Sequence, residues 1–205
     1  MAKEKTKVDS TFEKVDFLYA KGAIVNLSKN PRFTEKVLTG RPSIDWVTDG
    51  GVPRGREILI AGEPSAGKSS LTIQIAQEIG EKILYADTEA TLTTDYILSL
   101  GADPAKFDHF IPETTELMCD VIRQQIPNYD VIIIDSINNS ASGEQLQKTA
   151  GEKTMANRAN VLSSQLPILI GLCNQYNTTL IILSQVRDNM DKANKYSPDT
   201  VIPGG

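Results

Sequence analysis

The segment "AGEPSAGKSS" at residues 61–70 limits the local architecture of this chain more tightly than any other part of the sequence. Its glycines, Lys68 and Ser69 fit the pattern G-x-x-x-x-G-K-[ST], which forms a phosphate-binding loop where a strand precedes it and a helix follows it. The apolar run "EILIAG" at 57–62 predicts that strand, and the amphipathic pattern at 67–79 predicts that helix. The chain therefore has to form a strand–loop–helix unit that suits a nucleotide phosphate.

Each residue type in this loop has a chemical task. Gly62 and Gly67 let the backbone curl so that N–H groups point at a phosphate, and the helix N-terminus adds its dipole. Lys68 would reach the β- and γ-phosphate oxygens, and the Ser69 hydroxyl would ligate Mg²⁺. We therefore expect a nucleotide and Mg²⁺ as cofactors. The other residues predicted to bind the nucleotide in this loop are Glu63, Pro64, Ser65, Ala66 and Ser70.

Apolar runs and helical patterns alternate along the rest of the chain. Further strands are predicted at 82–87, 107–111, 131–135 and 179–184. Helices are predicted at 94–100, 114–126 and 154–176, the last with a kink or break at Pro167. Strands that are apolar throughout and separated by helices indicate an α/β fold with a parallel sheet covered on both faces. A short N-terminal appendage, a helix at 11–20 and a strand at 23–27, precedes a turn-rich lead-in at 28–55, and residues 188–205 read as a loop.

Polar residues follow three of the predicted strands. Asp135 ends the buried run "VIIID", where a carboxylate can bind Mg²⁺ or, alternatively, cap the next segment. Glu89, just after Asp87, can polarise an attacking water, although an isolated glutamate here is more often a solvated loop residue. Gln185 and Arg187 follow the last strand, where a polar side chain can sense a γ-phosphate and signal to the next loop.

Charge and composition narrow the function classes. The net charge of −5 provides no global basic field for nucleic acid, but leaves room for contacts through a few arginines and backbone N–H groups. Cys119 and Cys173 are expected to be buried, reduced thiols. With His109 as the only histidine and no Cys-x-x-Cys, the sequence does not suggest zinc. No apolar run reaches membrane-spanning length and the charged N-terminus does not resemble a signal peptide, so we expect a cytoplasmic protein, in the host cytoplasm if a phage encodes it.

From about residue 12 to Gly205, the ordered set of motifs resembles the RecA family of homologous-recombination ATPases, and bacterial and phage members more than eukaryotic ones. The matching segments are "KGAIVNL", "TGRPSIDWVTDGGVPRG", "GEPSAGKSS", "YADTEATLTTDYILSLGAD", "VIIIDSI" and "LSQVR". The resemblance implies a RecA-like P-loop NTPase core with ATP as the bound nucleotide. It also implies that Glu89 is catalytic together with Lys68, and that Gln185 couples the γ-phosphate to DNA affinity. Tyr96 falls where the family stacks an aromatic ring on adenine, with a core-facing tyrosine as the alternative.

The resemblance also implies DNA as a partner. A first DNA-binding loop is expected at 143–154, and a second after Arg187 through the final "PGG". Scattered solvated lysines are the alternative for each cation singly. The candidate DNA-binding residues are Lys148, Lys153, Arg158, Arg187, Lys192, Lys195, Gly204 and Gly205. Single-stranded and homologous duplex DNA are the expected substrates, and the N-terminal segment would join subunits head to tail in a helical filament.

These observations predict a filament-forming segment at 1–45 and an ATPase core at 46–205 that lacks the family's final strands and C-terminal domain. The leading functional hypothesis is a DNA-dependent ATPase that forms filaments on single-stranded DNA and promotes strand exchange. One alternative is an ATP-binding accessory module without strand exchange. The other is a hexameric helicase motor, which shares the core fold.

Overall fold

The computed structural model describes residues 28, 34–138, 155–188 and 200–201. The chain divides into two compact units, 1–34 and 35–205, and the described helices and strands belong to the second. The helix and strand predicted at 11–20 and 23–27 lie outside the described residues. The predicted division at 45/46 into a filament-forming segment and a core stays a prediction.

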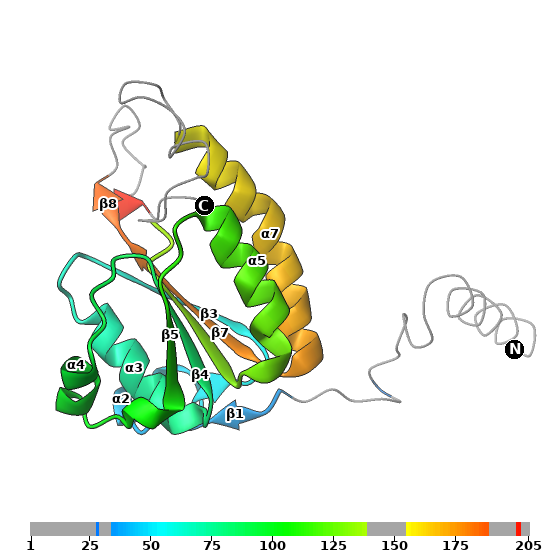
Figure 1. Cartoon of the computed structure of the whole chain (residues 1–205). Helices are drawn as coiled ribbons and strands as arrows, with labels where there is room; N and C mark the ends of the chain where they lie inside the picture. The colour runs from blue at the N-terminus through cyan, green and yellow to red at the C-terminus, as the bar shows by residue number, and fades with distance from the viewer. Residues whose placement is uncertain (1–27, 29–33, 139–154, 189–199, 202–205) are drawn as a thin grey trace, which may run out of the picture. The chain divides into compact units, whose positions relative to one another are not determined.

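A five-stranded parallel sheet forms the centre of the described unit (Figure 1). Its strands, in spatial order, are β3 (Glu57–Gly62), β7 (Thr179–Gln185), β6 (Val131–Asp135), β4 (Ile83–Asp87) and β5 (Phe107–Phe110). Every neighbouring pair is parallel, so all carboxyl ends meet at one edge of the sheet. The five strands predicted from the apolar runs are confirmed.

Helices cover both faces of this sheet, as predicted. The helices α3 (Lys68–Ile79) and α4 (Thr94–Ser99) supply apolar residues to the core on one face. The helices α5 (Thr115–Gln125) and α7 (Met155–Tyr176) pack together over the other face (Figure 1). The chain is thus an α/β protein with a doubly covered parallel sheet.

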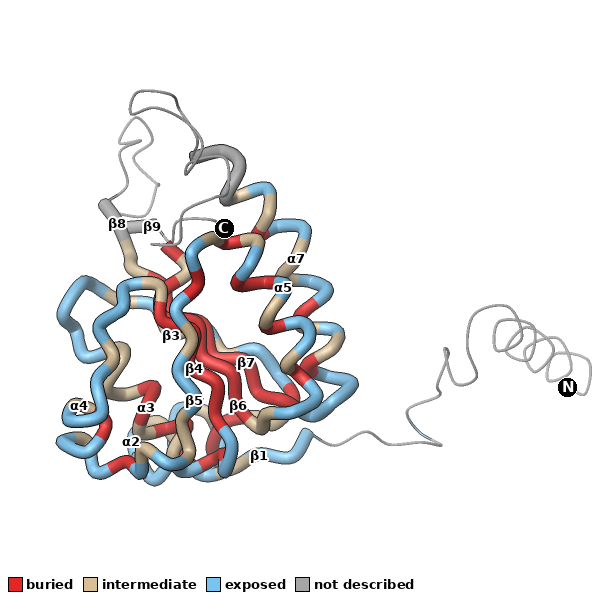
Figure 2. The backbone as a smooth tube through the Cα atoms, viewed as in Figure 1, coloured by how far each residue is buried: buried red, intermediate tan, exposed pale blue. Residues whose placement is uncertain are grey.

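The central strands are buried on both sides because successive side chains point to opposite faces. Ile133 of β6 packs in the cluster that contains α3, whereas Ile132 and Ile134 pack in the cluster that contains α5 and α7. Every residue of β4 and β6 is buried, and Figure 2 shows this buried band through the middle of the sheet. A strand enclosed on both faces needs an uninterrupted apolar run, and "VIIID" is such a run.

Of the kink or break predicted at Pro167, the break does not occur, because α7 continues from Met155 to Tyr176. Pro167 lies on the exposed side of α7, as does Ser163, whose carbonyl loses its helical partner. Water can satisfy that carbonyl, so the helix tolerates the proline. The two cysteines are free and buried, as expected.

The lead-in predicted as loop contains short elements: β1 (Lys36–Val37), α2 (Pro42–Val47) and β2 (Val52–Pro53). The strands β1 and β2 form an antiparallel pair, and α2 buries none of its residues. Likewise β8 (Arg187–Asp188) pairs with β9 (Thr200–Val201) inside the region predicted as loop. Strands of two residues are too short to show periodicity in a sequence. Two 3₁₀ turns, Pro104–Lys106 and Ile126–Asn128, complete the described elements.

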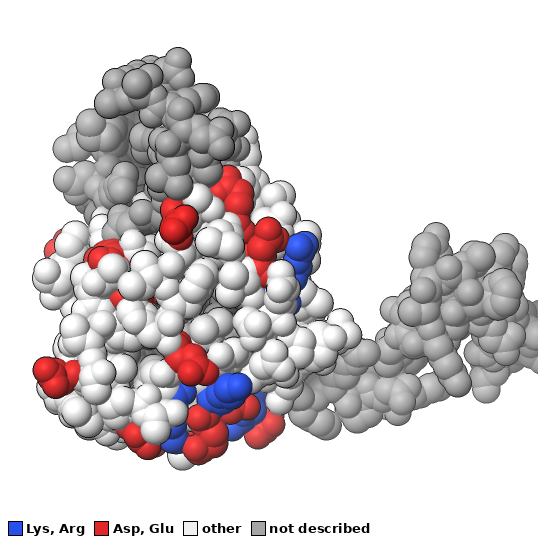
Figure 3. Space-filling model, viewed as in Figure 1, with Lys and Arg blue, Asp and Glu red and all other residues white. Residues whose placement is uncertain are grey.

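Within the described residues, none of the helices has the length and apolar character needed to cross a membrane. Lys and Arg side chains of these residues form no continuous basic area on the face drawn in Figure 3, where acidic side chains lie among them. This agrees with the net charge of −5.

Candidate nucleotide-binding site

The phosphate loop joins the carboxyl end of β3 to the first turn of α3. Gly67, the N-cap residue, has a φ of +84°, a left-handed conformation that glycine adopts without strain. As a glycine, this N-cap residue has no side chain that could accept a hydrogen bond from the first turn of α3. The first N–H groups of the helix can therefore serve an anion, as the sequence predicts.

Lys68 lies at the start of α3 and folds back over the loop. Its Nζ donates to the carbonyl oxygen of Glu63 at 2.8 Å. A single loop carbonyl is a weaker partner for an ammonium than a phosphate oxygen. The side chain is therefore held near the loop by a bond that it can exchange for an anionic ligand.

A hydroxyl–carboxylate pair bridges α3 and β6. The Oγ of Ser69 donates to Oδ2 of Asp135 at 2.6 Å, although the two residues are 66 positions apart. Asp135 is 8% exposed, so a small ligand in the cavity can reach it. Hydroxyl and carboxylate oxygens suit Mg²⁺, which keeps waters and takes phosphates rather than a full protein cage. No cluster of three or more His, Cys, Asp or Glu side chains that could hold a metal occurs in the part of the chain that the structure describes.

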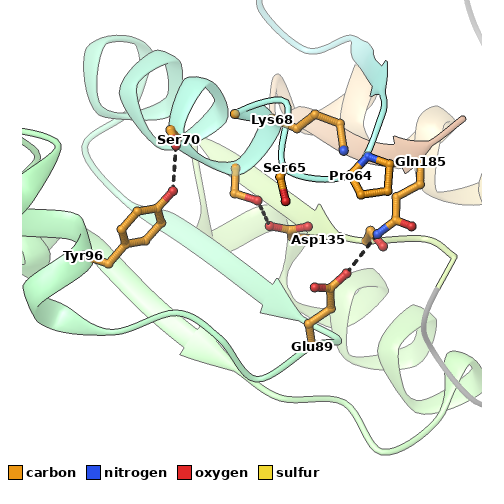
Figure 4. Close-up of a pocket in the computed structure, with 11 residues that line it drawn as sticks. Pro64, Ser65, Lys68, Ser70, Glu89, Tyr96, Asp135 and Gln185 are labelled. Carbon is orange, nitrogen blue, oxygen red and sulfur yellow. Dashed lines mark hydrogen bonds between the residues drawn. The ribbon is translucent and has the colours of Figure 1, made fainter.

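Glu89 and Gln185 meet at the same edge of the sheet, one after β4 and the other at the end of β7. Gln185 Nε2 donates to Glu89 Oε1 at 3.4 Å (Figure 4). The backbone N–H of Val186 also donates to the carbonyl oxygen of Gly62 at 3.2 Å, which links this strand end to the phosphate loop. The structure thus joins the two residues predicted for hydrolysis and for signalling.

Asp87 anchors the segment that carries Glu89. Its buried carboxylate accepts the N–H of Glu89 at 3.1 Å and the N–H of Leu92 at 2.8 Å. The Nε2 of His109, on the neighbouring strand β5, lies 3.1 Å from Asp87 Oδ2. The sequence places Asp87 at this strand end but indicates no partner for it. The contact with His109 depends on the pairing of β4 with β5.

Tyr96 of α4 packs against the core and borders the site, whereas its stacking on adenine stays a prediction. Its ring packs against the apolar core on the α3 side, and its hydroxyl lies 2.7 Å from Ser70 Oγ (Figure 4). The helix is positioned by Thr93, whose side chain accepts the N–H of Tyr96. One edge of the ring therefore faces the site while the other is fixed by packing.

These side chains enclose one cavity of about 320 Å³. It is lined by Pro64, Ser65, Gly67, Lys68, Ser69, Ser70, Glu89, Tyr96, Asp135, Ser136 and Gln185. Ser136 is the one lining residue that was not predicted from the sequence. Its buried Oγ has no hydrogen-bond partner within the described residues. A hydroxyl that follows a strand-end aspartate gives no signal of its own in a sequence.

The predicted ATP-binding residues Gly62, Glu63 and Ala66 belong to the loop but do not line the cavity. Arg158 lies within α7 and Arg187 within β8. The other DNA-binding candidates, Lys148, Lys153, Lys192, Lys195, Gly204 and Gly205, lie outside the described residues.

Asp135 has a second donor that was not predicted from the sequence. The hydroxyl of Tyr85, in the middle of β4, donates to Asp135 Oδ2 at 2.5 Å. Burial and the Asp135 carboxylate raise the pKa of Tyr85 above its usual range, so the hydroxyl remains a donor. In the sequence, Tyr85 lies inside an apolar run and reads only as a core residue.

A parallel sheet covered on both faces, with a phosphate loop after β3 and acidic residues after neighbouring strands, defines a P-loop NTPase fold of the RecA type. The family model described as the RecA N-terminal domain matches residues 6–205, and the chain belongs to the RecA family.

Individual relatives agree with this assignment. Protein RecA of Campylobacter hominis is 26% identical over 98% of this chain and 60% of its own length. Protein RecA of Nitratiruptor sp. is 29% identical over 96% of this chain and 59% of its own. The chain thus spans about 60% of the length of these relatives. A crystal structure of the RadB recombinase matches with a TM-score of 0.58 at 23% identity, covering 78% of this chain and 74% of that one, and supports the fold.

Proposed function

We propose that this chain is a DNA-dependent ATPase that assembles on single-stranded DNA and promotes homologous pairing and strand exchange. One observation carries the proposal: Lys68, Ser69, Asp135, Glu89 and Gln185 line a single cavity. The first three suit the binding of a magnesium nucleotide, and the last two suit its hydrolysis and the transmission of its state.

Each side chain of the cavity has a separate task in ATP binding or hydrolysis. Lys68 exchanges the Glu63 carbonyl for the β- and γ-phosphate oxygens. Ser69 and Asp135 would hold Mg²⁺, and the ion would neutralise phosphate charge when bound. Glu89 orients a water and accepts its proton as the water attacks the γ-phosphorus, and ADP leaves as the bond to the bridging oxygen breaks. The ring of Tyr96 lies at the edge of the cavity, where it can stack on the adenine.

Gln185 is proposed to transmit the state of the nucleotide. It contacts Glu89 on one side, and on the other its carbonyl oxygen accepts Asn138 Nδ2 at 3.1 Å. Asn138 immediately precedes the segment that contains the first predicted DNA loop, and Gln185 precedes the second. A shift of Gln185 toward a γ-phosphate would therefore act at the start of both predicted loops.

The DNA partner follows from family membership rather than from charge. Curated relatives are named Protein RecA, and the matching crystal structure is of a recombinase. We extend this to single-stranded DNA and a homologous duplex as substrates. We also extend it to a head-to-tail filament built by the N-terminal segment. The cations expected to contact DNA phosphates are the lysines and arginines predicted from the sequence.

Fluorescence anisotropy of a labelled oligo-dT, at about 50 mM and about 200 mM salt, tests the DNA function. We expect Mg-ATP to raise the DNA affinity about tenfold or more above that with Mg-ADP, within the usual range of coupling between two sites. Equal affinity with the two nucleotides would contradict the proposal. ATP binding without any DNA binding would favour an ATP-binding accessory module.

A further inference from the structure

Tyr85 combines a packed ring with a polar contact at the site. Only 2% of the residue is exposed, and it belongs to the core on the α3 face of the sheet. Tyr85 pairs in register with Ile133, two residues before Asp135 on β6. Residues two apart on a strand share a face, so Tyr85 and Asp135 are diagonal neighbours, a separation that a long aromatic side chain spans. The 2.5 Å hydrogen bond follows from this register.

The Asp135 carboxylate is consequently held from two sides. Ser69 donates from α3 and Tyr85 donates from β4, and both hydrogen bonds end on Oδ2. No other hydrogen bond to this side chain comes from the described residues, so Oδ1 remains available to a ligand in the cavity. A carboxyl group rotates readily about its last torsion unless a partner fixes it. Two donors on one oxygen fix the direction of the other.

Thr88, the residue that follows β4, holds the backbone of Asp135. The N–H of Thr88 donates to the carbonyl oxygen of Asp135 at 2.8 Å. The Thr88 hydroxyl lies 2.9 Å from the carbonyl oxygen of Ser136. Because Thr88 immediately precedes Glu89, β4 fixes Asp135 and carries the proposed catalytic glutamate at once.

We propose that Tyr85 is a positioning residue for the metal: its hydroxyl orients the Asp135 carboxylate toward Mg²⁺. The inference rests on the proposed function, in which Asp135 serves Mg²⁺. A phenylalanine would fill the core equally well, but it could not hold the carboxylate. Partners of this kind, which orient a metal-binding side chain, typically change metal affinity by about 10- to 100-fold when removed.

A magnesium titration of nucleotide binding tests the inference. The full chain is mixed with a ribose-labelled fluorescent ATP in EDTA, and MgCl₂ is then added until binding saturates. Tyr85→Phe is compared with the unmodified chain and with Tyr129→Phe. Tyr129 is a matched control because its hydroxyl donates to a different carboxylate, Asp108, at 2.8 Å, outside the cavity.

We expect Tyr85→Phe to require about tenfold more Mg²⁺ for half-maximal binding, with metal-free binding unchanged and Tyr129→Phe unaffected. We also expect Tyr85→Phe to add nothing in an Asp135→Asn background, because the hydroxyl acts only through that carboxylate. A role in packing alone would lack this dependence on Asp135.

The outcomes distinguish failure of the inference on Tyr85 from failure of the proposed function. If Asp135→Asn shifts the magnesium requirement and Tyr85→Phe does not, the inference on Tyr85 is wrong and the proposed function stands. If neither variant shifts it, the assignment of Mg²⁺ to Asp135 fails as well. A Tyr85→Phe chain that cannot fold also contradicts the inference. The inference gives the hydroxyl the single role of orienting one carboxylate, and loss of that role would leave the fold intact.

Discussion

Gln185 and Glu89 are 96 residues apart in sequence, and a 3.4 Å hydrogen bond joins their side chains at the carboxyl edge of the sheet. Gln185 ends β7, Glu89 follows β4, and β6 lies between those two strands. The pair thus spans the edge at which α/β proteins bind ligands. In the proposed function, Glu89 acts on water and Gln185 reports the γ-phosphate.

Replacing Gln185 by alanine separates these two actions. An exposed hydrogen bond between side chains is worth roughly 0.5–1.5 kcal/mol, so nucleotide binding should change by less than about tenfold. The difference in DNA affinity between Mg-ATP and Mg-ADP should disappear. Anisotropy with labelled oligo-dT measures both states. Gln125→Ala is the control, because Gln125 also forms a side-chain hydrogen bond, with Asn128, on the surface outside the cavity. If DNA affinity still differs between Mg-ATP and Mg-ADP in Gln185→Ala, Gln185 is not the transmitter.

Asp87→Asn should impair hydrolysis without impairing nucleotide binding. The buried carboxylate accepts two backbone N–H groups, and an amide NH₂ would face one of those donors. The segment carrying Glu89 then loses its anchor, and we expect turnover to fall about 100-fold, the effect typical of a displaced catalytic group. Single-turnover hydrolysis and fluorescent ATP binding measure the two quantities. Asp108→Asn, on exposed β5, is the control, and equal turnover in both variants would contradict the anchor.

Thr178→Val should weaken the fold and spare the site. The buried Thr178 hydroxyl is within hydrogen-bond distance of the carbonyl oxygens of Ile126 and Tyr129, at 2.7 and 2.9 Å. Valine keeps the shape and leaves both acceptors without this donor, at a cost of about 1–3 kcal/mol in free energy of unfolding. Urea unfolding at neutral pH measures this loss. A fall in nucleotide affinity that exceeds what the loss of stability explains would contradict this prediction. It would show that the region around Thr178 is coupled to the cavity.

Alkaline pH should destabilise the protein through its buried thiols. Burial raises the pKa of Cys119 from 9.0 to about 11 and that of Cys173 from 9.0 to about 12. Between these values the unfolded chain releases protons that the folded chain retains, so stability falls as the pH rises above 9.0. Each thiol contributes a loss of up to roughly 1 kcal/mol per pH unit.

Thermal unfolding at about pH 8 and about pH 10 tests this dependence. The double variant Cys119→Ala, Cys173→Ala should start less stable and lose less on the change of pH. An equal loss in the variant and the unmodified chain would assign the alkaline effect to other groups.

The sheet could be predicted from the sequence because enclosed parallel strands must be apolar on both faces, as in Val131–Asp135. The phosphate loop could be predicted because its residues are consecutive. Gathering Asp135, Glu89 and Gln185 required only that parallel strands end at one edge. The register between strands was not predictable, and it makes Tyr85 a partner of Asp135 and His109 a partner of Asp87. Short pairs such as β1–β2 carry no periodicity at all.

Steady-state ATP hydrolysis, with and without single-stranded DNA, is the measurement that tests the proposed function most directly. It compares the chain with Glu89→Gln and with Glu113→Gln, an exposed glutamate outside the cavity. We predict DNA-stimulated turnover that falls at least about 100-fold in Glu89→Gln, with ATP still bound, and that is unchanged in Glu113→Gln. A turnover rate that is the same with and without DNA, or that persists in Glu89→Gln, would contradict a DNA-dependent ATPase in which Glu89 is catalytic.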